Sequence, residues 1–387
     1  MIMPPEVVNP EQYKQTLIID HNRIREYTLV GLPIYLKAKP VVKAEEKTAV
    51  LDQVLDKKLV VLSGPSRIGK TSLAIQVQRE YEAKGGRSYL YSLQDIFDDF
   101  SAEPQILENF EAKTKTKALD LGDLANKLKA GGYLVVIDEL SRVIDTRESL
   151  HRQAGVIQEF IEQMSEKQVP LLIITHEYQH LLDEINKSWP LLAKAPKLIP
   201  RGLLPREVVD ISLYGNFVQI EKQPQRPEIY QGMDEKTGAE AIRLLGNWPV
   251  AISSLVYEFS RRNVEEERKT IEYKMDNASL YKELNKGLWY KLETSSQFST
   301  FTDLLKKDLK TAGVFDNFVE ALQIRKDFPY KPYRENVQPY SARLDAISPQ
   351  TLRHLLNLGV VVIQGNSIHI NGLLFSRLIS QPEFLED

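Results

Sequence analysis

A glycine, a lysine and a hydroxyl residue follow a short apolar run near residue 60. The string GPSRIGKT begins at Gly64 and ends at Thr71, and it fits the pattern G-x-x-x-x-G-K-[ST]. Glycines permit backbone angles that are forbidden to other residues, so successive N–H groups of such a loop can converge on phosphate oxygens. A helix that begins near Lys70 adds the positive end of its dipole. The loop therefore predicts a binding site for a nucleoside triphosphate.

Each position of this loop has an expected role. We expect Lys70 to reach the β and γ phosphates and Thr71 to offer its hydroxyl to Mg²⁺. The alternative is an ordinary glycine turn, but the apolar run before the loop and the helical pattern after it argue against that. ATP and Mg²⁺ are the expected ligands. The residues expected to bind the nucleotide are Gly64, Pro65, Ser66, Arg67, Ile68, Gly69, Lys70, Thr71 and Ser72.

Two carboxylates follow a second apolar run. In LVVIDEL, which starts at Leu134, Asp138 and Glu139 come directly after four apolar residues. Ligands bind outside the C-terminal ends of parallel strands, so we expect Asp138 to hold Mg²⁺. Glu139 would orient or deprotonate the attacking water, which makes it a catalytic candidate with Lys70. A strand that ends in solvated acids is the alternative, and the phosphate loop upstream disfavours it.

A third string, HEYQH from His176 to His180, matches the zinc-protease signature. That signature works only on a helix, where positions i and i+4 face one metal. Here the apolar run LLIIT leads directly into it, which places His176 at a strand end, and Glu184 is too close to be the usual third ligand. We expect instead that Thr175 or His176 lies beside the acidic strand and senses the γ-phosphate. Thr175 is therefore a third catalytic candidate.

The elements that must position these residues alternate along the chain. Continuous apolar strands separated by helices argue for a parallel sheet covered on both faces. Residues 1–40 contain five prolines and are expected to form an extended arm. The expected strands are 59–64, 88–93, 133–140, 170–176 and 197–202, and the expected helices are 70–84, 118–130 and 149–166.

The pattern changes after residue 205. Two helices separated by Gly246–Pro249 are expected over 236–262, and a charged helix over 263–290. The stretch 348–359 begins with an N-cap serine and a proline and ends in glycine, which are helix start and stop signals. Residues 360–370 indicate a strand, a turn and a strand. A helix followed by a β-hairpin at the end of a domain is the pattern of a winged helix.

Composition limits the class of protein. The chain has 387 residues, enough for two or three domains, with 42% hydrophobic and 27% charged residues, as in soluble globular proteins. The net charge of -3 argues against a strongly basic nucleic-acid coat but permits a local basic face. There is no cysteine, which excludes disulfides and a thiol nucleophile. The longest apolar runs are far short of the ~20 residues that span a bilayer, and Pro4, Pro5 and Glu6 do not fit a signal peptide. We expect a cytoplasmic protein without a membrane partner.

Together these motifs resemble the P-loop ATPases of the AAA+/STAND superclass, above all the archaeal-type ATPase family. GPSRIGKTSL is similar to the family's phosphate loop, and VVIDEL is similar to its acidic strand. GLLPREVVDI (202–211) resembles the segment that leaves its last strand, and LLGNWPVAI (244–252) resembles its lid motif. The resemblance spans roughly residues 41–375. It implies that adenine lies between Val41–Val42 and the lid, with Pro249 near the base.

The resemblance and the patterns predict one fold class. We expect an α/β fold in which the parallel sheet of a P-loop NTPase, flanked by helices, is followed by a helical lid and a C-terminal winged-helix-like domain. The expected boundaries are 1–40 for the arm, 41–215 for the ATPase core, 216–295 for the lid and 296–387 for the winged-helix-like domain.

Departures from the family pattern shape the functional hypothesis. Trp248–Pro249 stand where many AAA+ proteins place a sensor arginine. No clear arginine finger precedes the fifth strand, where Lys194 and Lys197 lie with Arg201 just after, although Arg142 is another basic candidate. These departures favour a slow ATPase that acts as a nucleotide-dependent switch in signalling or defence, with a protein partner and a nucleotide-dependent oligomer.

Three alternatives remain at this point. The first is a DNA-engaged AAA+ regulator of the initiator or transposition type. Residues 325–343 interleave basic and aromatic side chains that would suit single-stranded nucleic acid, or they form a proline-tethered loop whose tyrosines pack on the C-terminal helices. The candidate recognition helix carries only Arg353 and His354 as DNA contacts, so DNA stays open as a partner. A phosphotransferase would need an acceptor-binding lid that we do not recognise, and a zinc protease is the least supported reading.

Overall fold

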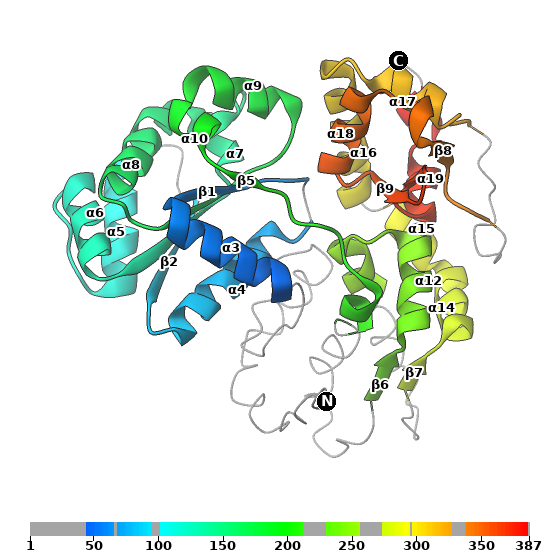
Figure 1. The fold of residues 1–387 in the computed structure, drawn as a ribbon, viewed down its shortest axis with the longest axis horizontal. Coiled ribbons are helices and arrows are strands. Elements are labelled where there is room, and N and C mark those ends of the chain that lie inside the picture. The colour runs from blue at the N-terminus through cyan, green and yellow to red at the C-terminus, as the bar shows by residue number, and fades with distance from the viewer. Residues whose placement is uncertain are drawn as a thin grey trace.

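The parallel sheet predicted from the sequence is present and consists of five strands. In the computed structural model, residues 44–65, 68–93, 101–209, 211, 230–255, 273–294, 296–326 and 337–385 are described. The strand order is β2–β3–β4–β1–β5, and each pair of neighbours is parallel (Figure 1). The strands are β1 (Leu59–Leu62), β2 (Arg87–Ser92), β3 (Tyr133–Asp138), β4 (Leu171–Ile174) and β5 (Lys197–Leu198).

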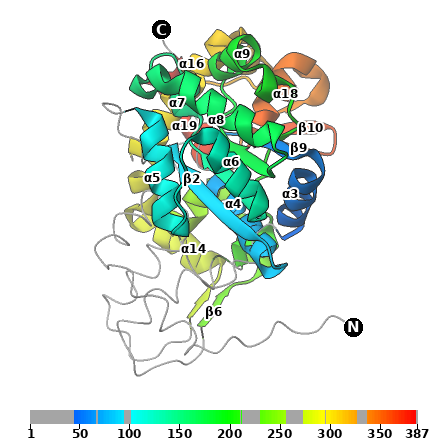
Figure 2. The same cartoon turned by 90° about the vertical axis from the view of Figure 1, so that its left-hand side faces the viewer.

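Helices cover both faces of this sheet because successive side chains of a strand point to opposite faces. Val60 and Leu62 pack with α3 (Ala44–Lys57) and α4 (Lys70–Ala83) in one apolar cluster. Leu59 and Val61 belong to the cluster of the other face. Figure 2 shows α5 beside the edge strand β2, and α6 contacts the next strand, β3. The helices that contribute to this second cluster include α5 (Ala102–Thr114), α6 (Leu121–Ala130) and α8 (Ala154–Glu166).

The strand order determines which residues meet at one edge of the sheet. Strand β4 lies between β1 and β3, with Leu62 paired to Ile174 and Ile137 paired to Ile173. The residues that follow these three strands therefore emerge side by side. Three shorter helices and a 3₁₀ turn complete the described elements of this domain: α7 (Ser141–Ile144), the 3₁₀ turn Ser149–Gln153, α9 (Gln179–Ser188) and α10 (Pro190–Lys194).

The middle of the chain differs in part from the expected helices. The first expected lid helix is α12 (Glu235–Leu245), and residues 249–255 are helical after the break at Gly246. The charged helix expected over 263–290 is wrong at residues 273–275, whereas residues 277–290 are helical. Residues Tyr273–Met275 form strand β7, which pairs with β6 (Tyr230–Met233). Asp276 then starts a new helix, because its carboxylate accepts the N–H of Ser279 (2.8 Å). The elements that follow are α14 (Asn277–Glu283), the π-helical turn Leu284–Leu288 and α15 (Trp289–Glu293).

The chain ends in a set of helices around a small antiparallel sheet of order β8–β10–β9. We call the described residues from α16 to α20 the C-terminal unit. The helix signals at 348–359 are confirmed, because Ser348 accepts the N–H of Thr351 (3.1 Å) and Pro349 is the first helical residue. The expected hairpin is β9 and β10. The elements are α16 (Ser296–Thr311), α17 (Phe315–Ala321), β8 (Ser341–Arg343), the 3₁₀ turn Leu344–Ala346, α18 (Pro349–Asn357), β9 (Val361–Gln364), β10 (Ser367–Ile370), α19 (Leu373–Leu378) and α20 (Pro382–Leu385).

The C-terminal unit packs on α12 and on the sheet-bearing domain (Figure 1). Gly246 lies so close to the C-terminal unit that a Cβ on it would be 2.3 Å from the carbonyl oxygen of Asn371. The Asn371 side chain donates to Oδ1 of Asn247 and to the carbonyl of Gly359, both at 2.7 Å. The expected break at Gly246 is therefore a packing requirement as well as a helix end. Among the described helices, none is long and apolar enough to cross a bilayer.

Candidate nucleotide-binding site

The phosphate loop connects β1 to α4, as its mechanism requires. Gly64 and Gly69 have φ angles of 144° and 92°, which favour glycine. The N-cap residue of α4 is Gly69, which has no side chain to cap the first turn, so the N–H groups and dipole of the helix face the loop. A helix N-terminus of this kind stabilises phosphate. Ser66 and Arg67, which the sequence assigns to the same loop, lie outside the described residues.

Lys70 is almost completely buried inside this loop, with 6% of its surface exposed. Its ammonium donates to the carbonyl oxygens of Gly64 (2.9 Å) and Pro65 (2.7 Å). Nδ1 of His176 lies 3.2 Å from the same Nζ. The ammonium is thus held by the loop itself, next to the place where phosphates are expected.

Asp138 and Thr71 come together as the sequence predicts. The Thr71 hydroxyl hydrogen-bonds Asp138, which is buried at the end of β3. Burial, assisted by the charge of Glu139, raises the pKa of Asp138 to about 6. Glu139 has a left-handed φ of 62°, and its N–H donates to Oδ1 of Asp138 (2.9 Å). Ionisation of the buried Asp138 beside a second acid is thus unfavourable, and a bound cation would relieve this.

The donors present fit Mg²⁺ of the kind that P-loop proteins bind. One hydroxyl and one carboxylate are in contact, and water and phosphate oxygens complete such a site in this class of protein. No group of three or more His, Asp or Glu side chains that could hold a metal occurs within the described ranges. The assignment of Thr71 and Asp138 as metal ligands stays a prediction.

Thr175 lies between the phosphate loop and the acid pair because β4 separates β1 from β3. Its N–H donates to the carbonyl of Leu62 (3.1 Å), which continues the sheet by one residue. Its hydroxyl is buried and has no hydrogen-bond partner among the residues described. A buried hydroxyl without a partner is costly, so this atom is available to a ligand oxygen. This position suits the expected phosphate sensor.

Ser63 and Glu177, to which the sequence analysis assigned no role, hold the segment after β4 in place. Ser63, the residue after β1, donates its hydroxyl to the buried carboxylate of Glu177. The N–H of Glu177 donates to the carbonyl of Gly64 (3.3 Å). These bonds join the segment after β4 to the start of the phosphate loop. Nothing in the sequence marks this pair, because 114 residues separate its members.

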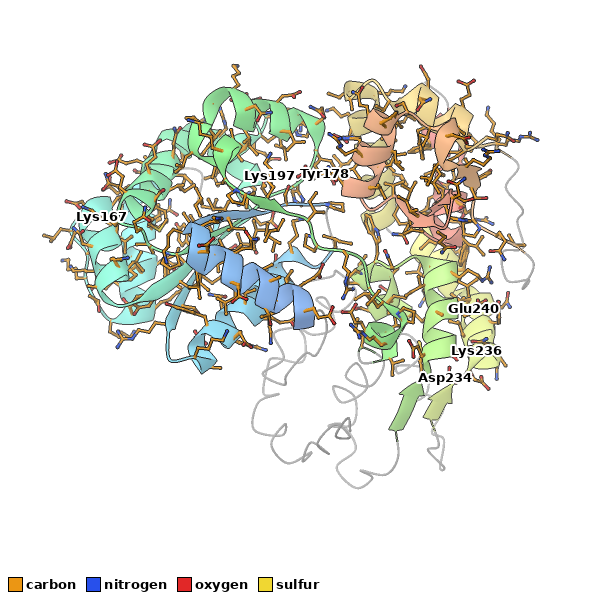
Figure 3. All side chains as sticks on the ribbon, viewed as in Figure 1. Lys167, Tyr178, Lys197, Asp234, Lys236 and Glu240 are labelled. Carbon is orange, nitrogen blue, oxygen red and sulfur yellow. The ribbon has the colours of Figure 1, made fainter. Side chains whose placement is uncertain are left out.

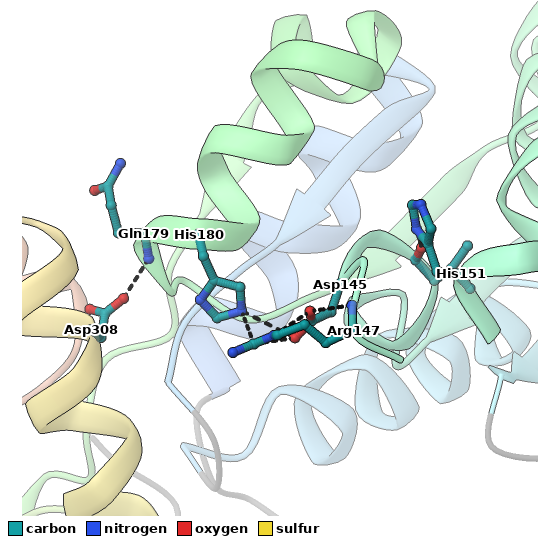
Figure 4. Close-up of polar contacts among 7 residues, drawn as sticks. Asp145, Arg147, His151, Gln179, His180 and Asp308 are labelled. Atoms are coloured by element: carbon teal, nitrogen blue, oxygen red, sulfur yellow. Dashed lines mark hydrogen bonds and ion pairs between the residues drawn. The ribbon is translucent and has the colours of Figure 1, made fainter. Parts of the chain in front are cut away.

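The HEYQH string does not lie on one helix. His176 and Glu177 precede α9, whereas His180 is its second residue. The strand-end position expected for His176 is confirmed. His180 lies instead beside Asp145 (3.2 Å) and Arg147 (2.7 Å), as Figure 4 shows. The geometry that a zinc protease requires is therefore not formed by this string.

The lid motif reaches the phosphate loop. A Cβ on Gly69 would lie 3.6 Å from Cγ of Pro249, so this proline is next to the loop. Val41 and Val42, the other expected contacts of the base, lie outside the described residues. Arg201 donates to both carboxylate oxygens of the buried Glu207 (2.7 and 2.8 Å). The guanidinium of Arg201 is thus committed within the chain, which argues against its use as an arginine finger.

Arg142, the other basic candidate, is also engaged internally. It donates to the carbonyl of Leu93 at the end of β2 (2.9 Å). Tyr178, labelled in Figure 3, lies on the side of the sheet-bearing domain that faces the C-terminal unit. The next residue, Gln179, donates its N–H to Asp308 of α16 (2.5 Å). The segment after β4 therefore connects the site to the C-terminal unit.

A phosphate loop between β1 and α4, with an acid pair two strands away, defines a P-loop NTPase. Residues 60–189 match the family model described as "ATPase family associated with various cellular activities (AAA)". This segment, about a third of the chain, runs from β1 to the end of α9 and is an AAA ATPase domain with a nucleotide-binding loop.

Several solved structures are similar to the chain in fold. The Walker-type ATPase of Pyrococcus abyssi is 15% identical, with 87% of this chain and 94% of that chain covered and a TM-score of 0.48. The ORC2 protein of Aeropyrum pernix, solved as ADPNP–ADP complexes, is 14% identical, with 92% and 97% covered and a TM-score of 0.49. Cdc6p from Pyrobaculum aerophilum is 12% identical, with 92% and 97% covered and a TM-score of 0.43. No curated protein is similar enough to count as a match.

The raised pKa of Asp138 predicts a stability effect. Because the folded protein binds this proton more tightly than the unfolded chain, the contribution of Asp138 to stability falls as pH rises from 3.8 to about 6. The ionised carboxylate then destabilises the fold by about 3 kcal/mol. We expect Asp138→Asn to raise the free energy of unfolding at pH 8 by up to that amount, and to have little effect at pH 3.5. Denaturant unfolding at both values measures this.

The exposed Asp52→Asn is the matched control, and it should change stability little at either pH. A destabilised Asp138→Asn protein at pH 8 would contradict the interpretation of a strained acid pair. Addition of Mg²⁺ should stabilise the wild type more than Asp138→Asn.

Proposed function

We propose that the protein is a Mg²⁺-dependent ATPase whose bound nucleotide controls how the C-terminal unit is held against the ATPase core. The AAA domain, the buried Lys70 and the acid pair support the ATPase part. The contact of Asp308 with the segment after β4 carries the switch part. We also propose the boundaries 41–215 for the core, 216–295 for the lid and 296–387 for a winged-helix-like domain.

The roles of the site residues follow from their charges and positions. Lys70 would exchange the carbonyls of Gly64 and Pro65 for phosphate oxygens. Mg²⁺, held by Thr71 and Asp138, would neutralise charge on the β and γ phosphates. Glu139 would accept a proton from the attacking water, or orient it. The hydroxyl of Thr175 would donate to the terminal phosphate, which satisfies an atom that is otherwise buried without a partner.

The switch element is a buried carboxylate that joins three helices. Asp308 on α16 is 3% exposed. One carboxylate oxygen accepts the N–H of Gln179 at the start of α9, drawn in Figure 4, and the other lies 2.7 Å from Nε2 of His354 on α18. Gln179 is only four residues beyond Thr175. A movement of Thr175 on binding a phosphate would therefore pass directly to Asp308 and α18.

Two further contacts connect the C-terminal unit to the nucleotide site. A Cβ on Gly359, just after α18, would lie 3.7 Å from Cγ of Pro65 in the phosphate loop. The Trp248 indole of the lid donates to the carbonyl of Gly359 (3.2 Å), and its ring packs on Phe375. The C-terminal unit thus touches the phosphate loop, the sensor segment and the lid. This arrangement supports a two-state device that one ligand can bias.

A role in DNA binding is the second candidate function. The elements α16, α17, β8, α18, β9 and β10 support a winged-helix-like unit, and Arg353 on α18 is exposed. His354, the other expected DNA contact, is only 10% exposed and faces Asp308. We infer that α18 would bind DNA only after it leaves Asp308. The first test is ATP turnover with and without duplex and single-stranded DNA, and stimulation that Lys70→Ala abolishes would favour this function.

The switch itself is tested by removing the buried carboxylate. We expect Asp308→Ala to release ADP about 10-fold faster or more, since a hydrogen bond to a buried charged group contributes ~1.5–3 kcal/mol. Limited proteolysis should also become independent of whether ATP or ADP is bound. Stopped-flow release of a fluorescent ADP analogue measures the first effect.

Asp303→Ala, on the same helix but exposed, is the control and should behave as the wild type. His354→Ala should reproduce part of the effect, because it removes only one partner of Asp308. If Asp308→Ala is folded and retains both the wild-type release rate and the wild-type dependence of cleavage on nucleotide, the switch proposal is wrong.

A further inference from the structure

One imidazole contacts both the lysine and the acid that are expected to handle the γ-phosphate. Nδ1 of His176 lies 3.2 Å from Nζ of Lys70, and Nε2 of the same ring lies 3.7 Å from Oε2 of Glu139. The three residues come from different elements: the start of α4, the end of β3 and the end of β4. The ring is therefore placed where a change at Lys70 can be transmitted to Glu139.

We propose that His176 is a positioning residue, whose Nδ1 competes with phosphate for Lys70 and whose Nε2 orients Glu139 toward the attacking water. This inference rests on the proposed ATPase function and extends it to a residue outside the phosphate loop and the acid pair. His176 makes no bond to the reacting atoms, and it acts through its two neighbours.

The charges of the neighbours select one protonation state of the ring. An ammonium can only donate a hydrogen bond and a carboxylate can only accept one. Nδ1 must therefore carry the lone pair that faces Lys70, and Nε2 must carry the hydrogen that faces Glu139. A neutral ring satisfies both neighbours, and this agrees with a pKa of His176 that burial and the charge of Lys70 hold below its usual value.

Packing behind the ring keeps it in this orientation. The rings of His176 and Tyr178 are 5.6 Å apart, and Tyr178 stacks on His180 at 6.1 Å. His180 contacts Asp145, whose carboxylate binds Arg147 on the surface, as Figure 4 shows. Glu139 has little freedom as well, because its backbone is in the left-handed region and bonded to Asp138. The His176 ring thus lies between the stacked rings of Tyr178 and His180 on one side and Lys70 and Glu139 on the other.

The two contacts predict two separate effects. Lys70 must leave Nδ1 to reach phosphate, so the His176 contact opposes nucleotide binding. Glu139 needs its second oxygen directed at water, and the Nε2 hydrogen restrains the first. Removal of the Nδ1 contact should therefore tighten ATP binding, whereas removal of the Nε2 contact should lower kcat.

Amide side chains can separate the two contacts. Asparagine has its polar atoms at the δ position and can keep the bond to Lys70, but it does not reach Glu139. Glutamine has its polar atoms at the ε position and can keep the contact with Glu139, but it leaves Lys70. Leucine keeps neither. His176→Asn, His176→Gln and His176→Leu therefore form a complete set with the wild type.

The experiment measures kcat for ATP and the equilibrium Kd for ATP with Mg²⁺ for all four proteins. We expect kcat to fall at least about 10-fold in His176→Leu and His176→Asn, and to stay within about threefold in His176→Gln. We expect the Kd for ATP to tighten about fivefold in His176→Leu and His176→Gln, and to be unchanged in His176→Asn. Melting curves establish that each variant is folded.

The result that overturns the proposal is a set in which the asparagine and glutamine variants behave alike, or in which the leucine variant equals the wild type. A purely structural role would lower stability and activity together in every variant. Lys70→Ala and Glu139→Gln are measured in parallel, because they test the ATPase function separately from the role of His176. If these abolish turnover while the His176 variants do not differ, only the role of His176 fails. If the wild type shows no turnover, the ATPase function and the role of His176 fail together.

Discussion

Lys70→Ala is expected to reduce ATP hydrolysis at least about 100-fold and to weaken ATP binding about 10-fold or more. The physical reason is the position of the ammonium, which is buried in the phosphate loop and held by carbonyls of Gly64 and Pro65. A buried cation at this place can bind phosphate oxygens without competition from bulk water. Alanine removes the side-chain charge that we expect to reach the β and γ phosphates.

Phosphate release and calorimetric titration with ATP measure the two effects. Lys84→Ala is the matched control, since this exposed lysine follows the opposite end of α4. Wild-type binding and turnover in a folded Lys70→Ala protein would remove the basis for the nucleotide site, and with it the proposed function. Loss of binding in both variants would point instead to damage of α4.

Glu139→Gln is expected to separate hydrolysis from binding. We expect turnover to fall about 100-fold or more, because a general base contributes 10²–10⁴-fold and an amide cannot accept the proton of water. The Kd for ATP should stay within about threefold, since Lys70 and the loop are untouched. The amide is close in size to the carboxylate, and the backbone bond of residue 139 to Asp138 does not depend on its side chain.

Single-turnover hydrolysis and a binding titration on the same preparation measure this difference. The exposed Glu148→Gln, a few residues further along the chain, is the control and should match the wild type. Unchanged turnover in Glu139→Gln would assign the base to another residue. Weakened binding of the same size as in Lys70→Ala would mean that Glu139 holds the loop together rather than acting on water.

The sequence by itself determined the phosphate loop, the acid pair and most of the elements that carry them. These features are local. The G-x-x-x-x-G-K-T string, the apolar run before Asp138 and the caps around α18 each lie within about fifteen neighbouring residues, where backbone angles and side-chain periodicity decide the structure. The strand signals for β1 to β4 were therefore correct to within two residues at each end.

Sequence reasoning failed where a local pattern had two outcomes. The charged stretch after residue 262 is compatible with one helix, but β6 offers a pairing partner, and residues 273–275 form a strand. In this stretch tertiary pairing overrides local preference. The HEYQH string was interpreted correctly, because the apolar run directly before it predicted strand β4 and excluded a single helix.

Only the tertiary structure decided how the site is connected to the rest of the chain. The order of the strands places Thr175 between Lys70 and Glu139, although Thr175 lies about 100 residues after Lys70 in the sequence. Asp308 contacts Gln179 across 129 positions, and His176 contacts Lys70 across 106. Nothing in a local pattern specifies such partners, because they depend on which faces pack when the whole chain folds. The chemistry of the phosphate loop could therefore be predicted from the local sequence, whereas the coupling of the loop to the C-terminal unit arises from long-range packing.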